Sequence, residues 1–250
     1  MPPIQFGLIG HRGVSGLYPE NTLVSFAAAK SHGLNWIEFD VMPCASGEWM
    51  VIHDERLERT TNGHGFVHDH SLLELKKLDA GSWFSRTFEN ECIPTLIEVL
   101  NLAKAYQLHP NIEIKINTFN DKVLRSLINT IKAVWPKKLP MPLFSSFNLE
   151  LLILLRQLEP CWPISFVSEA YNTGAIDILN HHKFQHLSFQ HDLIRPQDLF
   201  ELKQAKIPIS LYTLNDFSKL QMWQALGVDS FFTDRPDLLQ IRFDSKPKLL

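Results

Sequence analysis

The sequence has few cysteines and no long hydrophobic run. Cys44, Cys92 and Cys161 lie far apart in the 250 residues and form no C-x-x-C pair, which argues against a disulfide framework or a thiolate zinc site. No apolar run approaches the ~18 residues that a membrane span needs. Residues 1–6 show no basic stretch followed by an apolar one, so we expect no secretory signal. Together these features predict a cytoplasmic protein.

The chain also has no excess of charge of either sign. Its 24 basic and 27 acidic side chains leave a formal net charge of -3, which gives no support to a nucleic-acid partner. Only 11 glycines and 15 prolines are present, which excludes collagen-like and low-complexity chains. With 45% hydrophobic and 20% charged residues, the chain can bury a core. Function must therefore be sought in particular residues.

Short apolar runs alternate with helical patterns along the chain. The count of eight strands predicts an α/β fold, a TIM (β/α)8 barrel. An open doubly wound sheet is the alternative, but the turn after the first strand is not the glycine-rich one usual there. The predicted strands are 6–9, 36–41, 112–116, 143–147, 164–167, 187–189, 209–213 and 230–232. The predicted helices are 22–33, 95–107, 121–134, 149–158, 173–181, 196–204 and 216–226.

One stretch interrupts this alternation. A strand-like segment at 49–53 is followed by turn signals and a short helical piece at 72–78. We interpret residues 55–93 as an insertion after the second strand region, because the stretch is too short for a core of its own. The prediction is therefore a single domain over residues 1–250, with a frayed tail at 244–250.

Charged side chains gather at the ends of the first three strand regions, where barrel enzymes place their active sites. Such residues are costly to bury unless they are paired or bind a metal. Each taken alone is more often structural, but three strand regions carry them at the same end. The set comprises His11, Arg12, Glu38, Asp40, His53, Glu113 and Lys115.

The chemistry of this set points to a phosphate ester. Glu38 and Asp40 stand two residues apart, so both face one side of the strand. Carboxylate oxygens favour Mg²⁺ or Ca²⁺ over zinc. Arginine and lysine bind phosphate oxygens, and histidine exchanges protons near neutral pH. The combination predicts metal-assisted phosphoester cleavage.

An ordered series of motifs covers nearly the whole chain and resembles the glycerophosphodiester phosphodiesterase family, in its short cytoplasmic bacterial form. The motifs are HRG at 11–13, PENT at 19–22, IEFDV at 37–41, HD at 53–54, RTTNG at 59–63, ELKKLDAGSW at 74–83, IPTL at 93–96, EIK at 113–115, GVD at 227–229 and TDRP at 233–236.

The resemblance implies a TIM barrel that hydrolyses glycerophosphodiesters to sn-glycerol 3-phosphate and an alcohol with Mg²⁺ or Ca²⁺. It implies that His11 and His53 are the general acid and base, in an order that stays open. By the same resemblance, Glu38, Asp40 and Glu113 would hold the metal. Arg12 and Lys115 would stabilise the phosphate. The nucleophile, water or the glycerol hydroxyl, also stays open.

Two departures from the family pattern bear on the substrate. Tyr212 stands where the family commonly has tryptophan, so it is a candidate substrate-binding residue and equally a barrel core residue. A Ser46-Gly47 turn replaces the usual Asp-Gly. The alternatives to a small glycerophosphodiester substrate are larger lipid substrates, such as lysophospholipids, and a catalytically inactive barrel used as a binding module. The oligomeric state is not predicted.

Two further features have ordinary explanations. His64, His68 and His70 fit no common zinc spacing, so we expect solvated loop histidines. The aromatic residues Phe66, Trp83, Phe84 and Phe88 of the insertion could form a lid, but a small satellite core is favoured.

Overall fold

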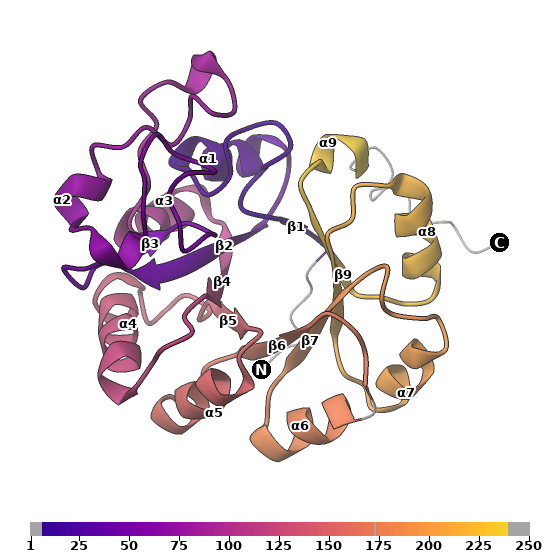
Figure 1. Ribbon diagram of the computed structural model, residues 1–250. Coiled ribbons are helices and arrows are strands. Elements are labelled where there is room, and N and C mark those ends of the chain that lie inside the picture. Colours follow the sequence, from indigo (N-terminus) through magenta and orange to yellow (C-terminus); the bar gives the residue numbers. More distant parts are fainter. Residues whose placement is uncertain (1–6, 173, 240–250) are drawn as a thin grey trace.

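The computed structural model describes residues 7–172 and 174–239, and its centre is a closed barrel of eight parallel strands (Figure 1). Strands pair in the order β1-β9-β8-β7-β6-β5-β4-β2, and a β1–β2 pairing closes the ring. β3 pairs antiparallel with the last three residues of β2. The strands are β1 (Gly7–Gly10), β2 (Trp36–Pro43), β3 (Trp49–Val51), β4 (His109–Ile114), β5 (Leu143–Ser146), β6 (Ile164–Ser168), β7 (His186–Gln190), β8 (Ile209–Tyr212) and β9 (Ser230–Thr233).

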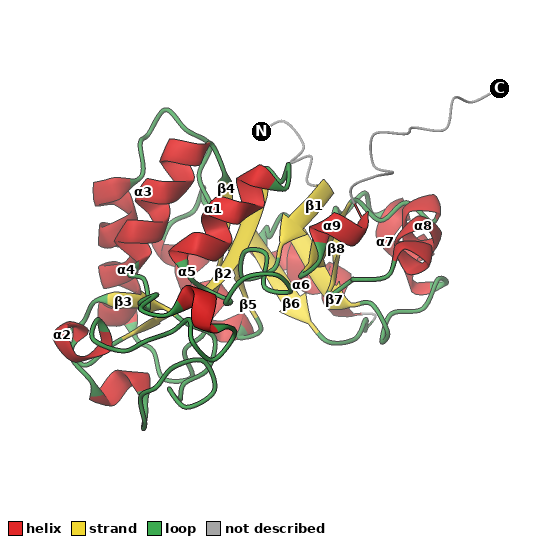
Figure 2. Ribbon diagram, turned by 90° about the horizontal axis from the view of Figure 1, so that it is seen from above, coloured by secondary structure: helices red, strands yellow, loops and turns green. Residues whose placement is uncertain are grey.

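Helices surround the barrel, as the view turned by 90° also shows (Figure 2). They are α1 (Leu23–Ser31), α2 (Leu72–Leu75), α3 (Leu96–Tyr106), α4 (Asp121–Val134), α5 (Leu149–Leu158), α6 (Gly174–His182), α7 (Asp198–Gln204), α8 (Phe217–Ala225) and α9 (Pro236–Leu239), with short 3-10 turns at Val67–Asp69 and Arg86–Phe88. The predicted barrel is confirmed, with strand ends shifted by a few residues. The predicted tail at 244–250, residue 6 of the first strand and residue 173 lie outside the described residues.

Period-two alternation assigns each strand side chain either to the barrel interior or to the helix layer. On β2, Ile37, Phe39 and Val41 belong to the main apolar core with the helices. Glu38 and Asp40, the residues between them, line the cleft inside the barrel mouth. The alternation that predicted a common face for these carboxylates is therefore what places them in the interior.

Polar side chains fill much of the barrel interior. His186 bonds to Ser165 Oγ at 2.9 Å through Nδ1 and to Ser210 Oγ at 3.0 Å through Nε2. Ser210 continues the chain of hydroxyls to Ser230, and Ser165 to Ser188. Burial lowers the pKa of His186 to about 3, so the ring is neutral at physiological pH.

Helix caps place the loops around the barrel mouth. Thr95 begins α3 with a capping box to Glu98, in which each side chain accepts from the other residue's backbone amide. Asn120 caps α4, and Asn148 caps α5 through its side-chain oxygen. The caps of α4 and α5 hold the turns that follow β4 and β5, and both turns border the site described below.

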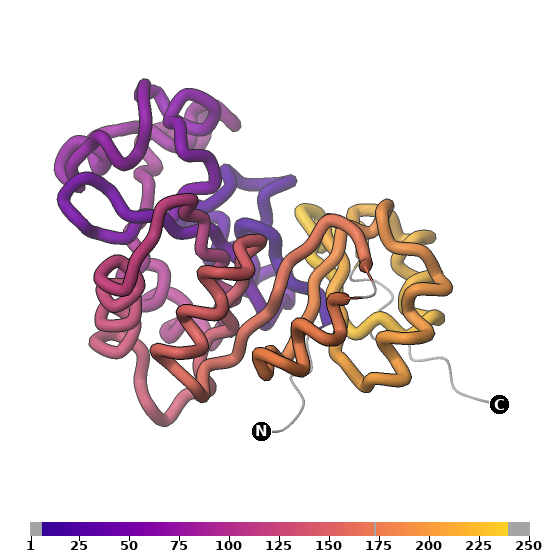
Figure 3. The backbone as a smooth tube through the Cα atoms, turned by 60° about the horizontal axis from the view of Figure 1, so that its bottom comes forward, coloured from indigo at the N-terminus to yellow at the C-terminus, as the bar shows by residue number. Residues whose placement is uncertain are grey.

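The connection between β3 and α3 departs from the barrel repeat and projects from one side of the molecule (Figure 3). Its aromatic side chains pack on one another: Phe84 lies edge-on to both Trp83 and Phe88, and Phe88 contacts Tyr18 of the β1–α1 loop. These contacts join three of the four aromatic residues of the predicted cluster, although Trp83 stays exposed. The fourth, Phe66, stacks instead on His68 and against Arg56. Within residues 7–172 and 174–239, His64, His68 and His70 belong to no group of potential metal ligands.

Every helix in this described part of the chain is too short or too polar to span a bilayer.

Candidate active site

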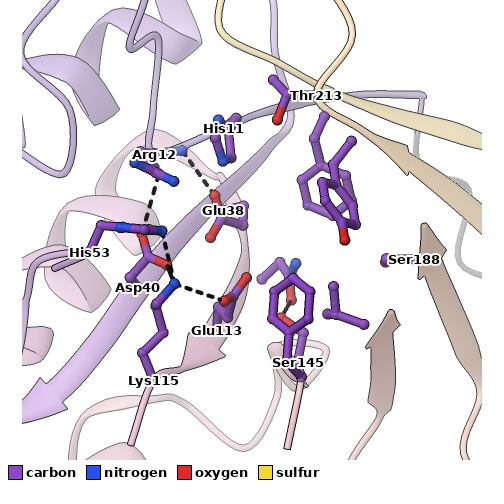
Figure 4. A pocket seen from close by; sticks show the side chains of 15 residues that line it. His11, Arg12, Glu38, Asp40, His53, Glu113, Lys115, Ser145, Ser188 and Thr213 are labelled. Atoms are coloured by element: carbon purple, nitrogen blue, oxygen red, sulfur yellow. Dashed lines mark hydrogen bonds and ion pairs between the residues drawn. The ribbon is translucent and has the colours of Figure 1, made fainter. Parts of the chain in front are cut away.

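A cleft of about 670 Å³ opens at the carboxyl ends of the barrel strands. All the residues that the sequence singled out for a site line it (Figure 4). These are His11, Arg12, Glu38, Asp40, His53, Glu113, Lys115 and Tyr212. Their convergence from β1, β2, β4, β8 and the loop after β3 agrees with the prediction of a single mouth, while their individual roles remain predictions.

Three carboxylates form the acidic centre of the cleft. Glu38 and Asp40 come from β2, and Glu113 stands directly beside Asp40 on the paired strand β4. One oxygen from each of the three lies within 4.8 Å of the others. Burial and the neighbouring carboxylates raise the pKa of Glu38 well above its usual range and that of Glu113 to about 7. Like charges packed this closely make the trio a place where a cation would relieve repulsion.

Asp40 is held in its charged form. Its burial would raise the pKa, but Arg12 and other positive neighbours outweigh that effect, so the pKa of Asp40 is lowered. Asn21 Nδ2 donates a hydrogen bond of 2.9 Å to its Oδ2, and Arg12 Nε lies 3.6 Å from the same oxygen. Asp40 therefore remains negatively charged and offers a ligand oxygen at the centre of the cleft.

The turn after β1 aims Arg12 at the acidic centre. Arg12 has a φ of 52°, and Gly13 follows with a φ of 89°. A Cβ on Gly13 would lie 2.2 Å from Ser25 Oγ, so this turn requires glycine. As a result the Arg12 backbone amide donates to Glu38 Oε2 at 3.0 Å while its guanidinium reaches Glu20 at 2.9 Å.

One nitrogen of Arg12 has no hydrogen-bond acceptor among the described residues. The buried Nε makes only the 3.6 Å approach to Asp40, which is too long for a hydrogen bond. A buried donor left unsatisfied is costly, and a phosphate oxygen in the cleft is a partner that would satisfy it.

His53 is bonded on both ring nitrogens. Its Nδ1 lies 2.6 Å from Asp54 Oδ1, and Lys115 Nζ lies 2.8 Å from its Nε2. Because lysine can only donate, the ring accepts at Nε2 and carries its proton at Nδ1. Burial, together with the nearby charges of Arg12 and Lys115, lowers the pKa of His53.

His11 has a carboxylate partner of its own from the opposite end of the chain. Its Nδ1 lies 2.7 Å from Asp234 Oδ1, just beyond β9, the strand that pairs with β1. Asp234 also accepts from Ser15 Oγ at 2.7 Å and from Asn215 Nδ2 at 2.8 Å. Although burial opposes it, these donors lower the pKa of Asp234. The Asp234 carboxylate therefore stays negatively charged while it holds the His11 ring in place.

Arg59, from the β3–α3 connection, ties the two sides of the mouth together. Its guanidinium donates to both oxygens of Glu20, at 2.7 and 2.8 Å, and to Asp54. Glu20 is also the partner of Arg12, and Asp54 that of His53. One exposed arginine thus supports two of the residues that line the cleft.

The residues that hydrogen-bond to the cleft-lining side chains and hold them in place were not predicted. Asp54, Asp234, Glu20 and Arg59 all fall inside motifs that the sequence carries, yet no role followed from them. Asp54 is adjacent to His53 in the sequence, which was a usable signal. The partnership of His11 with Asp234 spans 223 residues and follows only from barrel closure.

Tyr212 lies on the opposite wall of the cleft. Its ring is edge-on to Phe147, with centroids 6.0 Å apart, and its hydroxyl donates to the Ser168 carbonyl at 3.0 Å. It also packs against the small apolar cluster inside the barrel that includes Phe232. The structure therefore combines both interpretations of Tyr212, as a core residue and as part of the cleft wall.

Comparison with known proteins decides the family. The model of the glycerophosphoryl diester phosphodiesterase family matches residues 11–238. This chain belongs to that family. A glycerophosphodiester phosphodiesterase of Caldanaerobacter subterraneus subsp. tengcongensis is 34% identical over 93% of this chain and 95% of its own. One of Bacillus altitudinis is 30% identical over 96% of this chain and 99% of its own.

A solved structure extends the likeness to three dimensions. A phosphodiesterase of Oleispira antarctica, solved in complex with the product sn-glycerol-3-phosphate, superposes with a TM-score of 0.92 at 34% identity. The match covers 96% of this chain and 97% of that one. The family resemblance, the TIM barrel and the expectation of a phosphodiesterase enzyme are thereby confirmed.

Proposed function

We propose that this glycerophosphodiester phosphodiesterase hydrolyses small glycerophosphodiesters to sn-glycerol 3-phosphate and an alcohol, with a divalent cation and two histidines. The observation that carries the proposal is a single cleft holding a carboxylate trio, two phosphate-binding cations and two carboxylate-paired histidines. The product named for the Oleispira antarctica relative supports the same substrate class.

The acidic trio fits a hard cation. Glu38, Asp40 and Glu113 offer only oxygen atoms, close together and partly or wholly buried, which favours Mg²⁺ or Ca²⁺ over zinc. A divalent cation bound there would supply charge stabilisation to the phosphoryl oxygens. Burial is the main cause of the raised pKa values of Glu38 and Glu113, and repulsion from the neighbouring carboxylates, which such an ion would relieve, adds to it.

Arg12 and Lys115 bind the phosphate. The buried Nε of Arg12 supplies a donor without a hydrogen-bond partner in the described chain. Lys115 Nζ lies 3.6 Å from Glu113 and 3.9 Å from Asp40, so its charge stands at the rim of the trio. Both groups neutralise charge that builds up on the phosphate in the transition state.

His11 and His53 move protons. Each ring has an aspartate at Nδ1, which fixes the neutral tautomer with Nε2 as the atom that exchanges a proton with a substrate oxygen. At His53 this nitrogen accepts from Lys115 Nζ, so the lysine would have to turn from the ring to the phosphate when substrate binds. In this proposal one ring removes a proton from the attacking hydroxyl or water and the other donates one to the departing alcohol. Asp54 and Asp234 stabilise the charged rings.

The histidine assignment is tested by substitution. We expect His11→Ala and His53→Ala each to lower turnover of a glycerophosphodiester by ~10²–10⁴-fold, the usual contribution of a general acid or base. His68→Ala is the control, because His68 is an exposed loop residue away from the cleft. Near-normal activity in either cleft variant would remove that histidine from the mechanism.

The metal assignment is tested by chelation and by direct binding. We expect dialysis against a chelator to abolish activity and Mg²⁺ or Ca²⁺ to restore it. Glu113→Ala should weaken cation binding measured by calorimetry, whereas Glu89→Ala, at an exposed acid outside the cleft, should not. Full activity without metal would contradict the assignment.

Two further expectations stay with the proposal. We propose that the chain acts as one catalytic domain, which is supported by a single apolar cluster containing Leu57 and Val67 of the insertion together with barrel residues. Cytoplasmic location remains a prediction from cysteine usage, to be tested by localising the tagged protein. Activity on lysophospholipids but not on short glycerophosphodiesters would favour the lipid alternative. No release of glycerol 3-phosphate from any diester would favour a binding module.

A further inference from the structure

A second cleft, of about 530 Å³, adjoins the active site beside the loops that follow β4 and β5. Four residues line both clefts: His53, Glu113, Lys115 and Phe147. A phosphodiester has two alcohol portions joined at one phosphorus. A phosphate held among the shared residues would therefore direct one portion into each cleft.

The first cleft suits the glycerol portion. Of the residues that line only this cleft, Asn111, Ser145 and Ser188 are buried and offer hydroxyl and amide groups to a polyol. Tyr212 and Phe232 complete the wall, where they can contact the carbon chain. Because the closed barrel limits the space in this cleft, the cleft suits the glycerol portion that all glycerophosphodiesters share. The variable alcohol then lies in the second cleft.

The second cleft combines a carboxylate with an exposed aromatic ring. Glu55 lines it, and its Oε1 accepts a 2.6 Å hydrogen bond from Asn117 Nδ2, which orients the carboxylate without neutralising it. The side chain of Phe147 is 45% exposed. An anion and an aromatic face in one cleft together attract an organic cation.

The lysine that borders this cleft does not cancel the attraction. Lys115 Nζ is bonded to His53 and stands within 4 Å of both Asp40 and Glu113, at the end that the two clefts share, and in the proposed function its charge is taken up by the phosphate. Glu55 takes part in none of the ion pairs found among the described residues. Asn148, at the cleft edge, uses its side-chain oxygen to cap α5.

We propose that Glu55 and Phe147 form a leaving-alcohol subsite that selects diesters of positively charged alcohols, either amino alcohols or quaternary ammonium alcohols. This inference rests on the proposed function and adds the substrate class. It assigns specificity to Glu55 and Phe147, which contact the departing alcohol and take no part in proton transfer.

The test compares kcat/KM for glycerophosphocholine and glycerophosphoethanolamine with that for glycerophosphoglycerol, whose leaving alcohol is neutral. We expect the parent protein to prefer the cationic diesters. Glu55→Gln should lower kcat/KM for them about two- to five-fold, the scale of one partly exposed charge pair, and lower it less for glycerophosphoglycerol. Phe147→Leu should cause a loss of about two- to five-fold on the same substrates.

The matched control is Glu58→Gln, which removes the same charge three residues away. Glu58 pairs with Arg56 and lines neither cleft, so the ranking of substrates should not change. The preference for cationic diesters should also shrink at high salt.

The outcomes separate this inference from the proposed function. Equal kcat/KM for cationic and neutral diesters, or equal losses on all of them in Glu55→Gln, would overturn the subsite while hydrolysis itself stands. Failure to hydrolyse any glycerophosphodiester would overturn both.

Discussion

Asp234→Asn tests whether the carboxylate behind His11 takes part in the reaction. The substitution keeps the size of the side chain and removes its charge. Asp234 accepts hydrogen bonds on both oxygens: Oδ1 from His11 and Ser15, Oδ2 from Asn215. An amide must place its NH₂ group at one of these two positions. Either way a donor then meets a donor, so the imidazole changes its tautomer or the link to Asn215 is lost.

The magnitude follows from the single contact that changes. The 2.7 Å bond between His11 Nδ1 and Asp234 is charge-assisted once the ring takes up a proton in the reaction. Hydrogen bonds to charged groups contribute roughly 1.5–3 kcal/mol. If that stabilisation is lost in the transition state, turnover falls by about 10- to 150-fold, at ~1.4 kcal/mol per tenfold. The effect should appear in kcat more than in KM, because Asp234 does not line the cleft.

The assay is steady-state release of glycerol 3-phosphate across a range of pH. Besides the loss of kcat, we expect KM to change little at each pH, because Asp234 does not line the cleft. Asp192→Asn is the matched control. Asp192 Oδ1 lies 3.1 Å from His191 Nδ1 without forming a hydrogen bond, and Asp192 lies on the surface outside the cleft.

A thermal melt of each variant separates catalysis from folding. The reasoning is refuted if Asp234→Asn folds normally and keeps turnover within twofold of the parent. A loss that matched a fall in folded protein would mean that Asp234 serves only to join β9 to the β1–α1 loop.

Two other substitutions test the supports around the mouth and the barrel interior. Arg59→Ala should lower turnover about two- to tenfold, because Asp54 and Glu20 each lose a charged donor. Arg56→Ala is the control. Equal activity of the two variants would contradict the supporting role of Arg59. His186→Gln should flatten the fall in the free energy of unfolding between about pH 6.5 and 4.5. Because burial lowers the pKa of His186 to about 3, only the unfolded chain takes up that proton in this range, and the native protein loses ~1.4 kcal/mol per pH unit. Denaturant titrations at several pH values measure the slope, and unchanged slopes would refute the prediction.

The barrel and its mouth could be predicted because both depend on short-range patterns. Alternation on β2 separates Ile37, Phe39 and Val41 from Glu38 and Asp40, and the same period places Glu113 on the inner face of β4. Parallel pairing then brings Asp40 beside Glu113 without further information. A residue whose position follows from strand period and strand order can be placed from the sequence alone.

Strand ends and the insertion were less predictable. The pattern ended the second strand at residue 41, yet β2 continues to Pro43, because β3 returns along it and pairs with its last residues. The pattern placed Lys115 within a strand, whereas β4 ends at Ile114 and Lys115 begins the loop. Local propensity cannot report such ends, since hydrogen bonds to a neighbouring segment decide them.

The two histidines show where sequence reasoning stops and why. His53 takes its carboxylate from the next residue, so the pair is formed by a local turn and is visible in the sequence. His11 takes its carboxylate from Asp234, and the two meet only because β9 pairs with β1 and closes the ring. The two histidine–aspartate pairs of one cleft thus depend on different levels of the structure. Reading the second pair from the sequence requires that the barrel be closed first, and that closure depends on the pairing of all eight strands.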